Sequence, residues 1–104
     1  MKTSIITEFV KFQVLETMTQ EQFLEKAEQM ISGFLAKQPG FRNAELIKDL
    51  KENSWCFILR YDSIEQVNHI VEKLRESKEF EDFKKGLITG SLQVSFSSQL
   101  QTWE

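Results

Sequence analysis

The segment 36-AKQPGFRNAEL-46 decides the fold, because it must end a helix and return the chain as a strand. Pro39 has no amide hydrogen to donate and disfavours helical geometry in the residue before it. Residues 38–41 also carry Pro and Gly at the second and third positions of a type II turn, where Gly40 can take the positive φ that the turn requires. The segment therefore predicts a helix that ends near Lys37, then a tight turn and a strand.

The residues before this corner have the spacing of an amphipathic helix. Within 17–37, apolar side chains recur at positions i, i+3, i+4 and i+7, which places them on one helical face. Thr19 and Gln22 have the spacing of a capping box, which predicts the start of the helix. The apolar face consists of Phe23, Leu24, Ala27, Met30, Ile31, Phe34 and Leu35.

The residues after the corner predict a hairpin, because 44–50 and 55–62 read as strands joined by the polar residues 51–54. A strand over 5–14 precedes the first helix, and a strand over 91–97 ends the pattern with strict alternation of apolar and polar residues.

A second helix is predicted between the hairpin and the last strand. It begins with the capping-box pair Ser63 and Gln66, and a short helical segment over 77–87 follows it and ends before Gly90. The apolar stripe of the second helix is Val67, Ile70, Val71 and Leu74.

The predicted order is strand, helix, strand, strand, helix, strand. This is the ferredoxin-like βαββαβ arrangement of the α+β class, with a four-stranded antiparallel sheet and helices on one face. The 104 residues suit one domain over 1–104, in which residues 97–104 can form a mobile tail or a partner-binding arm.

Apolar residues on both faces of the predicted sheet suggest a homodimer. The third strand carries Trp55, Phe57, Leu59 and Tyr61 on one parity, with Cys56 and Ile58 on the other. Helices can cover only one face, so the second apolar face predicts two sheets packed face to face in a dimeric α+β barrel. Arg60 and Trp103 are the candidate interface residues.

Composition excludes several classes of partner. The formal charge of −3 arises from 13 basic and 16 acidic residues that form no basic stripe, so nucleic acid is not an expected partner. No run approaches the roughly 20 apolar residues of a membrane span. Cys56 is the only cysteine, and residues 1–16 lack the features of a signal peptide. These features predict a cytoplasmic protein without a membrane partner.

Several stretches together resemble the antibiotic biosynthesis monooxygenase-like domains, which are dimeric α+β barrels of about this size. These stretches are a helix ending in the PGF of residues 39–41, a hairpin ending in the YDS of 61–63, and the SKEFEDF of 77–83. The resemblance is clearest over residues 34–85. The family includes cofactor-independent monooxygenases of polyphenolic or quinone-type substrates, haem-degrading monooxygenases, and members without known activity.

The resemblance implies a monooxygenase that oxidises a small aromatic, polyphenol or quinol-type substrate without metal, flavin or other cofactor. Such an enzyme needs a water-poor, aromatic-lined pocket and one or two polar groups that hold a phenolate. The haem-degrading branch has an Asn on the first strand, a Trp at the end of the third, and a His on the next helical segment. Here Tyr61 takes the place of that Trp, and both other residues are missing.

Tyr61 and Trp55 are the candidate catalytic residues, because each combines an aromatic ring with a hydrogen-bond donor. His69 is expected in solvent, almost opposite the apolar stripe of its helix, and Cys56 is expected to be a buried inert thiol. No spacing indicates a metal site, a phosphate-binding glycine loop or a nucleophile elbow. The alternative function is a non-catalytic dimeric module of the same fold that binds a small ligand or a protein.

Overall fold

The computed structural model describes residues 5–104, so residues 1–4 of the predicted domain lie outside the described part. Four antiparallel strands form one sheet in the order β2-β3-β1-β4. The α+β prediction with a four-stranded antiparallel sheet is confirmed. The strands are β1 (Ile6–Phe12), β2 (Phe41–Lys48), β3 (Trp55–Tyr61) and β4 (Gln93–Ser98). The helices are α1 (Gln20–Gly33), the short 3-10 helix η1 (Leu35–Lys37), α2 (Ile64–Arg75) and α3 (Lys78–Lys84).

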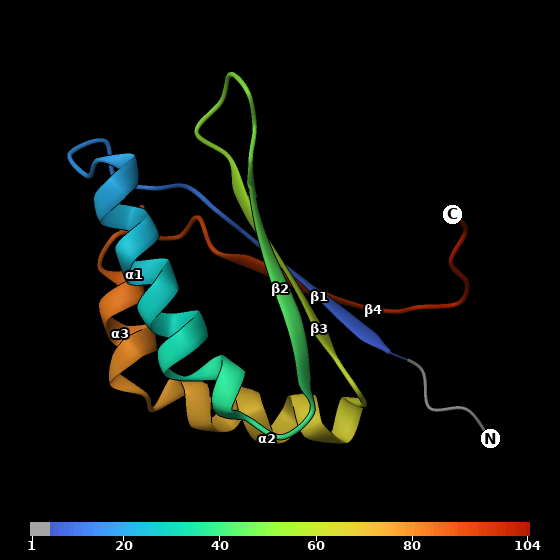
Figure 1. The fold of residues 1–104 in the computed structure, drawn as a ribbon. Helices are drawn as coiled ribbons and strands as arrows, with labels where there is room; N and C mark the ends of the chain where they lie inside the picture. The colour runs from blue at the N-terminus through green and yellow to red at the C-terminus, as the bar shows by residue number, and fades with distance from the viewer. Residues whose placement is uncertain (1–4) are drawn as a thin grey trace.

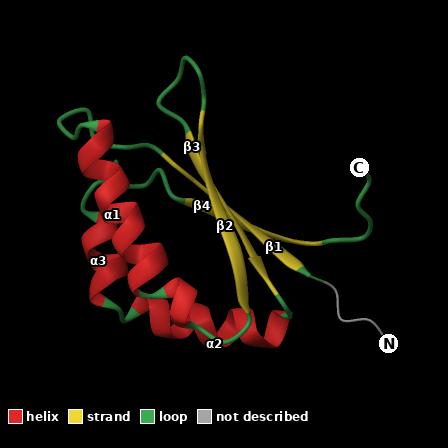
Figure 2. Ribbon diagram, viewed as in Figure 1, coloured by secondary structure: helices red, strands yellow, loops and turns green. Residues whose placement is uncertain are grey.

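The three α-helices lie together on one side of the sheet (Figures 1 and 2). Helices α1 and α3 run side by side, whereas α2 crosses near the end of the sheet where β3 finishes. No helix within residues 5–104 lies over the opposite face of the sheet (Figure 2). Beyond β4, residues 99–104 extend away from the helices, and Trp103 at this end is 80% exposed (Figure 1).

Aromatic rings dominate the core between the helices and the sheet. The odd-numbered residues of β3 face the helices and are buried, which assigns the two parities of this strand to the two faces of the sheet. Phe12 of β1 is central in this core, with ring centroids 5.5 Å from Phe23, 5.7 Å from Phe57 and 5.5 Å from Phe83. Rings at such separations gain attraction beyond the burial of their surface.

The turn at the decisive corner is confirmed. The Phe41 amide donates to the Gln38 carbonyl at 3.2 Å, and Gly40 has a φ of +92°. The predicted continuous helix to Lys37 is wrong in its last turn, because α1 ends at Gly33 and the chain tightens into η1. Glycine is a poor helix former, and a 3-10 turn is a common way to end a helix.

The strand boundaries also differ from the prediction. β2 begins at Phe41 rather than residue 44, because the turn delivers the chain directly to the sheet and a register shift between Phe41 and Asn43 absorbs one extra residue. β1 ends at Phe12 rather than residue 14. The Asn53 side chain accepts from the Val14 amide at 3.1 Å and donates to the Val14 carbonyl at 2.8 Å, which replaces the sheet ladder there.

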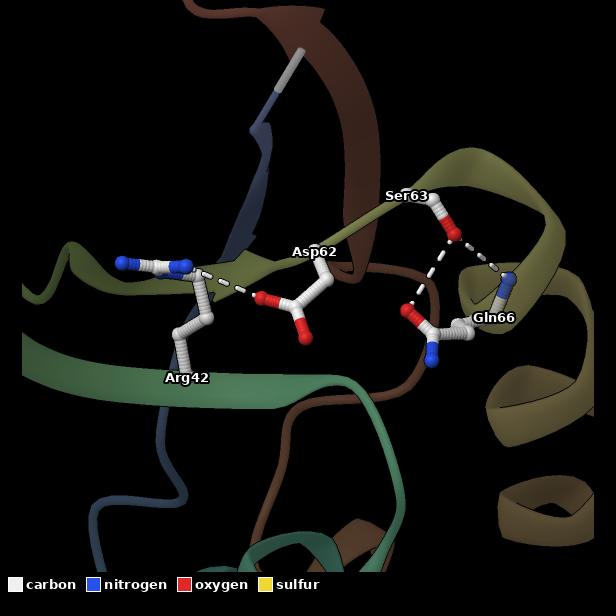
Figure 3. A network of polar contacts seen from close by, with 4 residues as sticks. All are labelled: Arg42, Asp62, Ser63 and Gln66. Atoms are coloured by element: carbon white, nitrogen blue, oxygen red, sulfur yellow. Dashed lines mark hydrogen bonds and ion pairs between the residues drawn. The ribbon is translucent and has the colours of Figure 1, made fainter. Parts of the chain in front are cut away.

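Polar contacts attach α2 to the same corner (Figure 3). Arg42 of β2 forms an ion pair with Asp62 at 2.9 Å, immediately before α2. The Ser63 hydroxyl caps α2 by accepting from the Gln66 amide at 3.4 Å and donates to Gln66 Oε1 at 3.1 Å. The predicted spacing therefore marks the helix start, although Gln66 bonds the hydroxyl of Ser63 and not its backbone. At Thr19 both bonds of the predicted capping box are present.

We expect Gly40→Ala to lower the free energy of unfolding by about 1–3 kcal/mol, because alanine is strained at positive φ and is also blocked by a neighbour. An added Cβ would clash with the carboxamide carbon and oxygen of Gln66. Gly90 has a φ of +83° and no atom within 4 Å of its added Cβ, so Gly90→Ala is a matched control that isolates the backbone cost. Urea unfolding measures both variants, and equal losses would contradict the contact with Gln66.

Candidate functional site

A cavity of about 300 Å³ lies between the sheet and the helices. It is lined mainly by apolar side chains, with β1, β3 and β4 forming its floor and the three helices its walls. Val94 and Phe96 of β4 line it and remain 48% and 45% exposed, so the cavity reaches solvent along this edge strand. Such a space suits a small, flat, apolar ligand.

Glu8 is the acidic group in the cavity wall. It belongs to the helix-facing side of β1, where it lies opposite Leu59 of β3 and Phe96 of β4. The residue is only 7% exposed, which is unusual for a carboxyl group. Burial of this kind requires a hydrogen-bond partner or a shift toward the neutral form.

Tyr61 supplies that partner. Its hydroxyl donates to Glu8 Oε1 at 2.8 Å, and the residue itself is fully buried. Ile6 is the direct cross-strand partner of Tyr61, so Tyr61 and Glu8 form a diagonal pair on one face of the sheet. The Phe41 ring, from the decisive corner, packs edge-on against Tyr61 at 5.9 Å and fixes its orientation.

The environment changes the acidity of both groups. Burial raises the pKa of the Glu8 carboxyl above its ordinary value, and the hydrogen bond from Tyr61 partly opposes this change. Burial also raises the pKa of Tyr61, and the nearby charge of Glu8 adds to that rise. Tyr61 therefore stays protonated and acts as a donor, while Glu8 is the group that exchanges a proton in an accessible pH range.

Arg75, at the end of α2, is the other charged residue that lines the cavity. It is exposed and has no acidic partner within 4 Å among residues 5–104. Its position near the opening leaves the interior of the cavity apolar except for Glu8.

The two predicted catalytic residues lie at opposite ends of β3, roughly 20 Å apart at the rise of a strand. Tyr61 contacts Glu8, which lines the cavity. Trp55 packs against Phe23 with ring centroids 5.0 Å apart, and its Nε1 donates to Asn53 Oδ1 at 3.2 Å. The structure therefore brings Tyr61, but not Trp55, to the cavity.

The predicted interface residues lie elsewhere. Arg60 points to the uncovered face of the sheet, where its Nη1 lies 2.7 Å from Glu45 Oε1 and 3.0 Å from Asn43 Oδ1. Trp103 lies in the exposed C-terminal segment. His69 is exposed and Cys56 is a buried free thiol, as predicted.

The uncovered face has its own apolar hollow of about 540 Å³. Phe9, Ile47, Cys56 and Ile58 line it together with polar residues from the strand ends. Ile47 is 51% exposed, and no described element covers this face. We call this surface the outer face.

Sequence reasoning missed Glu8, although the sequence contained a signal for it. Glu8 has the same strand parity as Ile6, Val10 and Phe12, so a charged residue interrupts the apolar face of the predicted first strand. A carboxyl on a core-facing position is rarely retained without a partner or a function. The partner, Tyr61, lies 53 positions away and becomes evident only in the sheet register.

The apolar lining of the cavity can shield a flat ligand from water, and the Glu8 carboxyl can accept a hydrogen bond or a proton from that ligand. Within residues 5–104, no cluster of His, Cys, Asp and Glu could hold a metal ion. The described helices are all too short or too polar to cross a bilayer.

The chain matches the family model described as antibiotic biosynthesis monooxygenase over residues 5–86. Among solved structures, SnoaB, a cofactor-independent oxygenase from Streptomyces nogalater, shares 16% identity at a TM-score of 0.75, with 96% of this chain and 97% of SnoaB covered. The Rv0793 protein from Mycobacterium tuberculosis shares 15% identity at a TM-score of 0.72, with 97% of this chain and 100% of Rv0793 covered. A conserved protein from Methanosarcina mazei shares 14% identity at a TM-score of 0.71, with 91% of this chain and 92% of that protein covered. No curated protein sequence gives a significant match.

Proposed function

The chain belongs to the antibiotic biosynthesis monooxygenase family, and from this premise we propose that it is a cofactor-independent monooxygenase of a small aromatic substrate of the polyphenol or quinol type. The structural neighbour SnoaB, described as a cofactor-independent oxygenase, supports this reaction class. At 16% identity that neighbour supports the fold directly and the chemistry only by analogy.

The observation that carries the proposal is the apolar cavity with one buried carboxyl in its wall. A small aromatic substrate fits a space of about 300 Å³. Inside it, Glu8 is the group to which a substrate hydroxyl can donate, while apolar residues such as Phe57 and Phe83 contact the ring faces. The site thus fixes both the position and the orientation of a phenol.

The chemistry requires little more than this environment. An electron-rich phenolate can reduce dioxygen by itself once its proton has been removed, so the protein must bind, orient and deprotonate the phenol. A water-poor pocket protects the reactive intermediates from side reactions. Holding the substrate in one geometry also removes much of the entropic cost of the encounter.

Oxygen uptake tests the proposal directly. The panel consists of dihydroxynaphthalenes, anthrones and quinols with metal-stripped protein, and chromatography identifies the products. We expect uptake with at least one substrate in the absence of added metal or flavin, and one oxygen atom from labelled dioxygen in the product. Binding without uptake across the panel would favour the alternative, a non-catalytic module that binds a small ligand.

Filling the cavity should abolish the activity without unfolding the protein. Val94→Trp places a large indole in the cavity from a half-exposed position on an edge strand, so we expect turnover to fall by roughly 100-fold, the effect of displacing a substrate from its reactive position. Val94→Ile is the matched control and should keep the rate within a few-fold. Wild-type turnover in Val94→Trp would show that the substrate binds elsewhere.

We also propose that the protein is a homodimer formed through the outer face. The apolar hollow around Ile58 supports this assembly, because a face-to-face contact would bury the side of the sheet that the helices leave uncovered. The exposed Trp103 lies in a terminal segment that extends beyond the sheet, and we propose that it contacts the partner. The single buried thiol of Cys56 suits a reducing compartment, and we propose the cytoplasm.

A further inference from the structure

Glu8 is surrounded by apolar groups on every side except one. On its own face of the sheet its neighbours are Leu59 and Phe96, and the helices add further apolar side chains across the cavity. Oε1 receives the Tyr61 hydroxyl at 2.8 Å. Oε2 has no hydrogen-bond partner among residues 5–104 and keeps some exposed surface. Because Glu8 lines the cavity, we infer that Oε2 faces it.

Among the residues that the structure describes, Glu8 is the one base that lines the cavity. The described charged and titratable residues near the carboxyl are Tyr61 of β3, which contacts it, and Arg75 of α2, which lines the same space. Tyr61 is already a donor, and the guanidinium of Arg75 offers N–H donors but no acceptor. From α1, α3 and β4 only apolar side chains line the cavity. A proton leaving a ligand in this cavity therefore has Glu8 as its acceptor.

We propose that Glu8 is the catalytic residue that removes the phenolic proton of the substrate, and that Tyr61 is the positioning residue that directs the free carboxylate oxygen into the cavity. This inference rests on the proposed function. The Tyr61 hydroxyl holds Oε1, so Oε2 faces the substrate hydroxyl. General base catalysis of this kind requires the acceptor within hydrogen-bond reach of the proton, and the cavity wall provides that position.

The step balances with dioxygen as the only co-reactant. Glu8 takes the hydroxyl proton, and the phenolate gives one electron to dioxygen. The resulting radical and superoxide join through a new C–O bond at the para ring carbon. Glu8 returns its proton to the outer peroxide oxygen. The Glu8 carboxylate then takes the ring C–H proton as the O–O bond breaks and passes it to the released hydroxide, so the products are a quinone and water. One oxygen atom enters the substrate and the other is reduced to water.

The buried position makes Glu8 a better base than an exposed carboxylate. Burial raises its pKa, so the ionised form holds a proton more strongly than a carboxylate in water. The hydrogen bond from Tyr61 stabilises the ionised form and limits this rise. Tyr61 therefore favours the ionised form of Glu8, which is the form that can accept a proton.

The first test is Glu8→Gln, which preserves the shape of the side chain and its ability to accept from Tyr61. We expect kcat to fall by about 100- to 10,000-fold, the usual contribution of a general base. Anaerobic calorimetry with 2-naphthol should show affinity within a few-fold of wild type. The matched control is Glu25→Gln on the exposed surface of α1, which should change neither value.

The second test is Tyr61→Phe, with the pH dependence of kcat/KM as the readout. In the wild type kcat/KM should rise with pH as Glu8 ionises. Removal of the donor raises the pKa of Glu8 further, so the rise should move to higher pH while the plateau is partly retained. A purely structural role of Tyr61 would lower the plateau and leave the position of the rise unchanged.

A third measurement reports on Glu8 without turnover. Because the folded protein holds the Glu8 proton more tightly than the unfolded chain, wild type loses stability relative to Glu8→Gln as pH rises above the ordinary carboxyl pKa. In urea unfolding, the free energy of unfolding of Glu8→Gln should therefore exceed that of wild type by a small amount at pH 4 and by a larger amount at pH 8. This result would also establish that the inactive variant is folded.

The outcomes separate this inference from the proposed function. If wild type oxidises a panel substrate and folded Glu8→Gln does so at the same rate, the assignment of Glu8 is overturned and the proposed function stands. If wild type oxidises nothing, the proposed function fails. In that case the affinity for 2-naphthol, measured without oxygen, decides. An affinity that rises with pH in wild type but not in Glu8→Gln supports Glu8 as the proton acceptor. An affinity that does not change with pH in wild type overturns this assignment.

Discussion

Replacing Phe12 with alanine is expected to lower the free energy of unfolding by about 3–5 kcal/mol, the typical cost of truncating a buried phenylalanine. Phe12 is 2% exposed and its ring contacts three others, from Phe23, Phe57 and Phe83. Those partners come from α1, β3 and α3. The truncation therefore leaves a hole where the sheet and two helices meet.

The hole should be costly because the neighbours cannot close it. Phe23, Phe57 and Phe83 also contact one another or further rings, so a shift of any one of them would disturb other pairs. Proteins of this size have a total stability of only about 5–15 kcal/mol, so the loss would consume much of it. We expect the variant to have a lower melting temperature and a large fall in the urea midpoint.

Phe96→Ala is the matched control. Phe96 is 45% exposed on the edge strand, so the same truncation there should cost less than about 1.5 kcal/mol. Urea unfolding by circular dichroism gives both values under the same conditions. Similar losses in the two variants would show that the aromatic core contributes no more than general burial of apolar surface.

The order of the elements could be predicted from local sequence because each boundary has a local cause. Pro39 and Gly40 determine the corner, Thr19 and Ser63 cap helices, and alternation marks the strands. The end of α1 at Gly33 and the early start of β2 could not be predicted in the same way. At Gly33 two local signals conflict, because glycine disfavours a helix while the apolar spacing continues to Leu35. The start of β2 depends on its pairing with β3, which is distant in sequence.

The site was harder to predict than the fold. Tyr61 was recognised from its aromatic ring and hydroxyl, but its partner Glu8 lies on another strand, and their contact depends on the register between β1 and β3. Trp55 has the same parity as Tyr61, so periodicity alone could not separate them. The structure separates them because Trp55 lies at the other end of the strand, beside Asn53.

The second large effect concerns the proposed dimer, which Ile58→Asp should dissociate. Ile58 lies in the apolar hollow of the outer face, on the strand parity opposite the core. In a two-fold symmetric interface the substitution occurs twice, so two carboxylates would be buried without partners. With a cost of a few kcal/mol for each, the dissociation constant should rise by roughly 1,000-fold or more.

Sedimentation at micromolar concentration measures this change, and circular dichroism establishes that the variant is folded. Ile64→Asp is the matched control, because Ile64 is 43% exposed in the first turn of α2, where an acidic side chain is tolerated, and lies outside the outer face. It should leave the protein dimeric. A monomeric wild type, or a dimer that persists in folded Ile58→Asp, would contradict the proposed interface.

The same variant also tests whether catalysis depends on the dimer. The residues that line the cavity around Glu8 face the helices, whereas Ile58 points to the other side of the sheet. If the cavity of one chain is sufficient, the folded monomer should bind 2-naphthol with an affinity within a few-fold of wild type. A monomer that binds normally but no longer consumes oxygen would instead indicate that the partner completes the site, and the exposed segment carrying Trp103 would be the first candidate for that contribution.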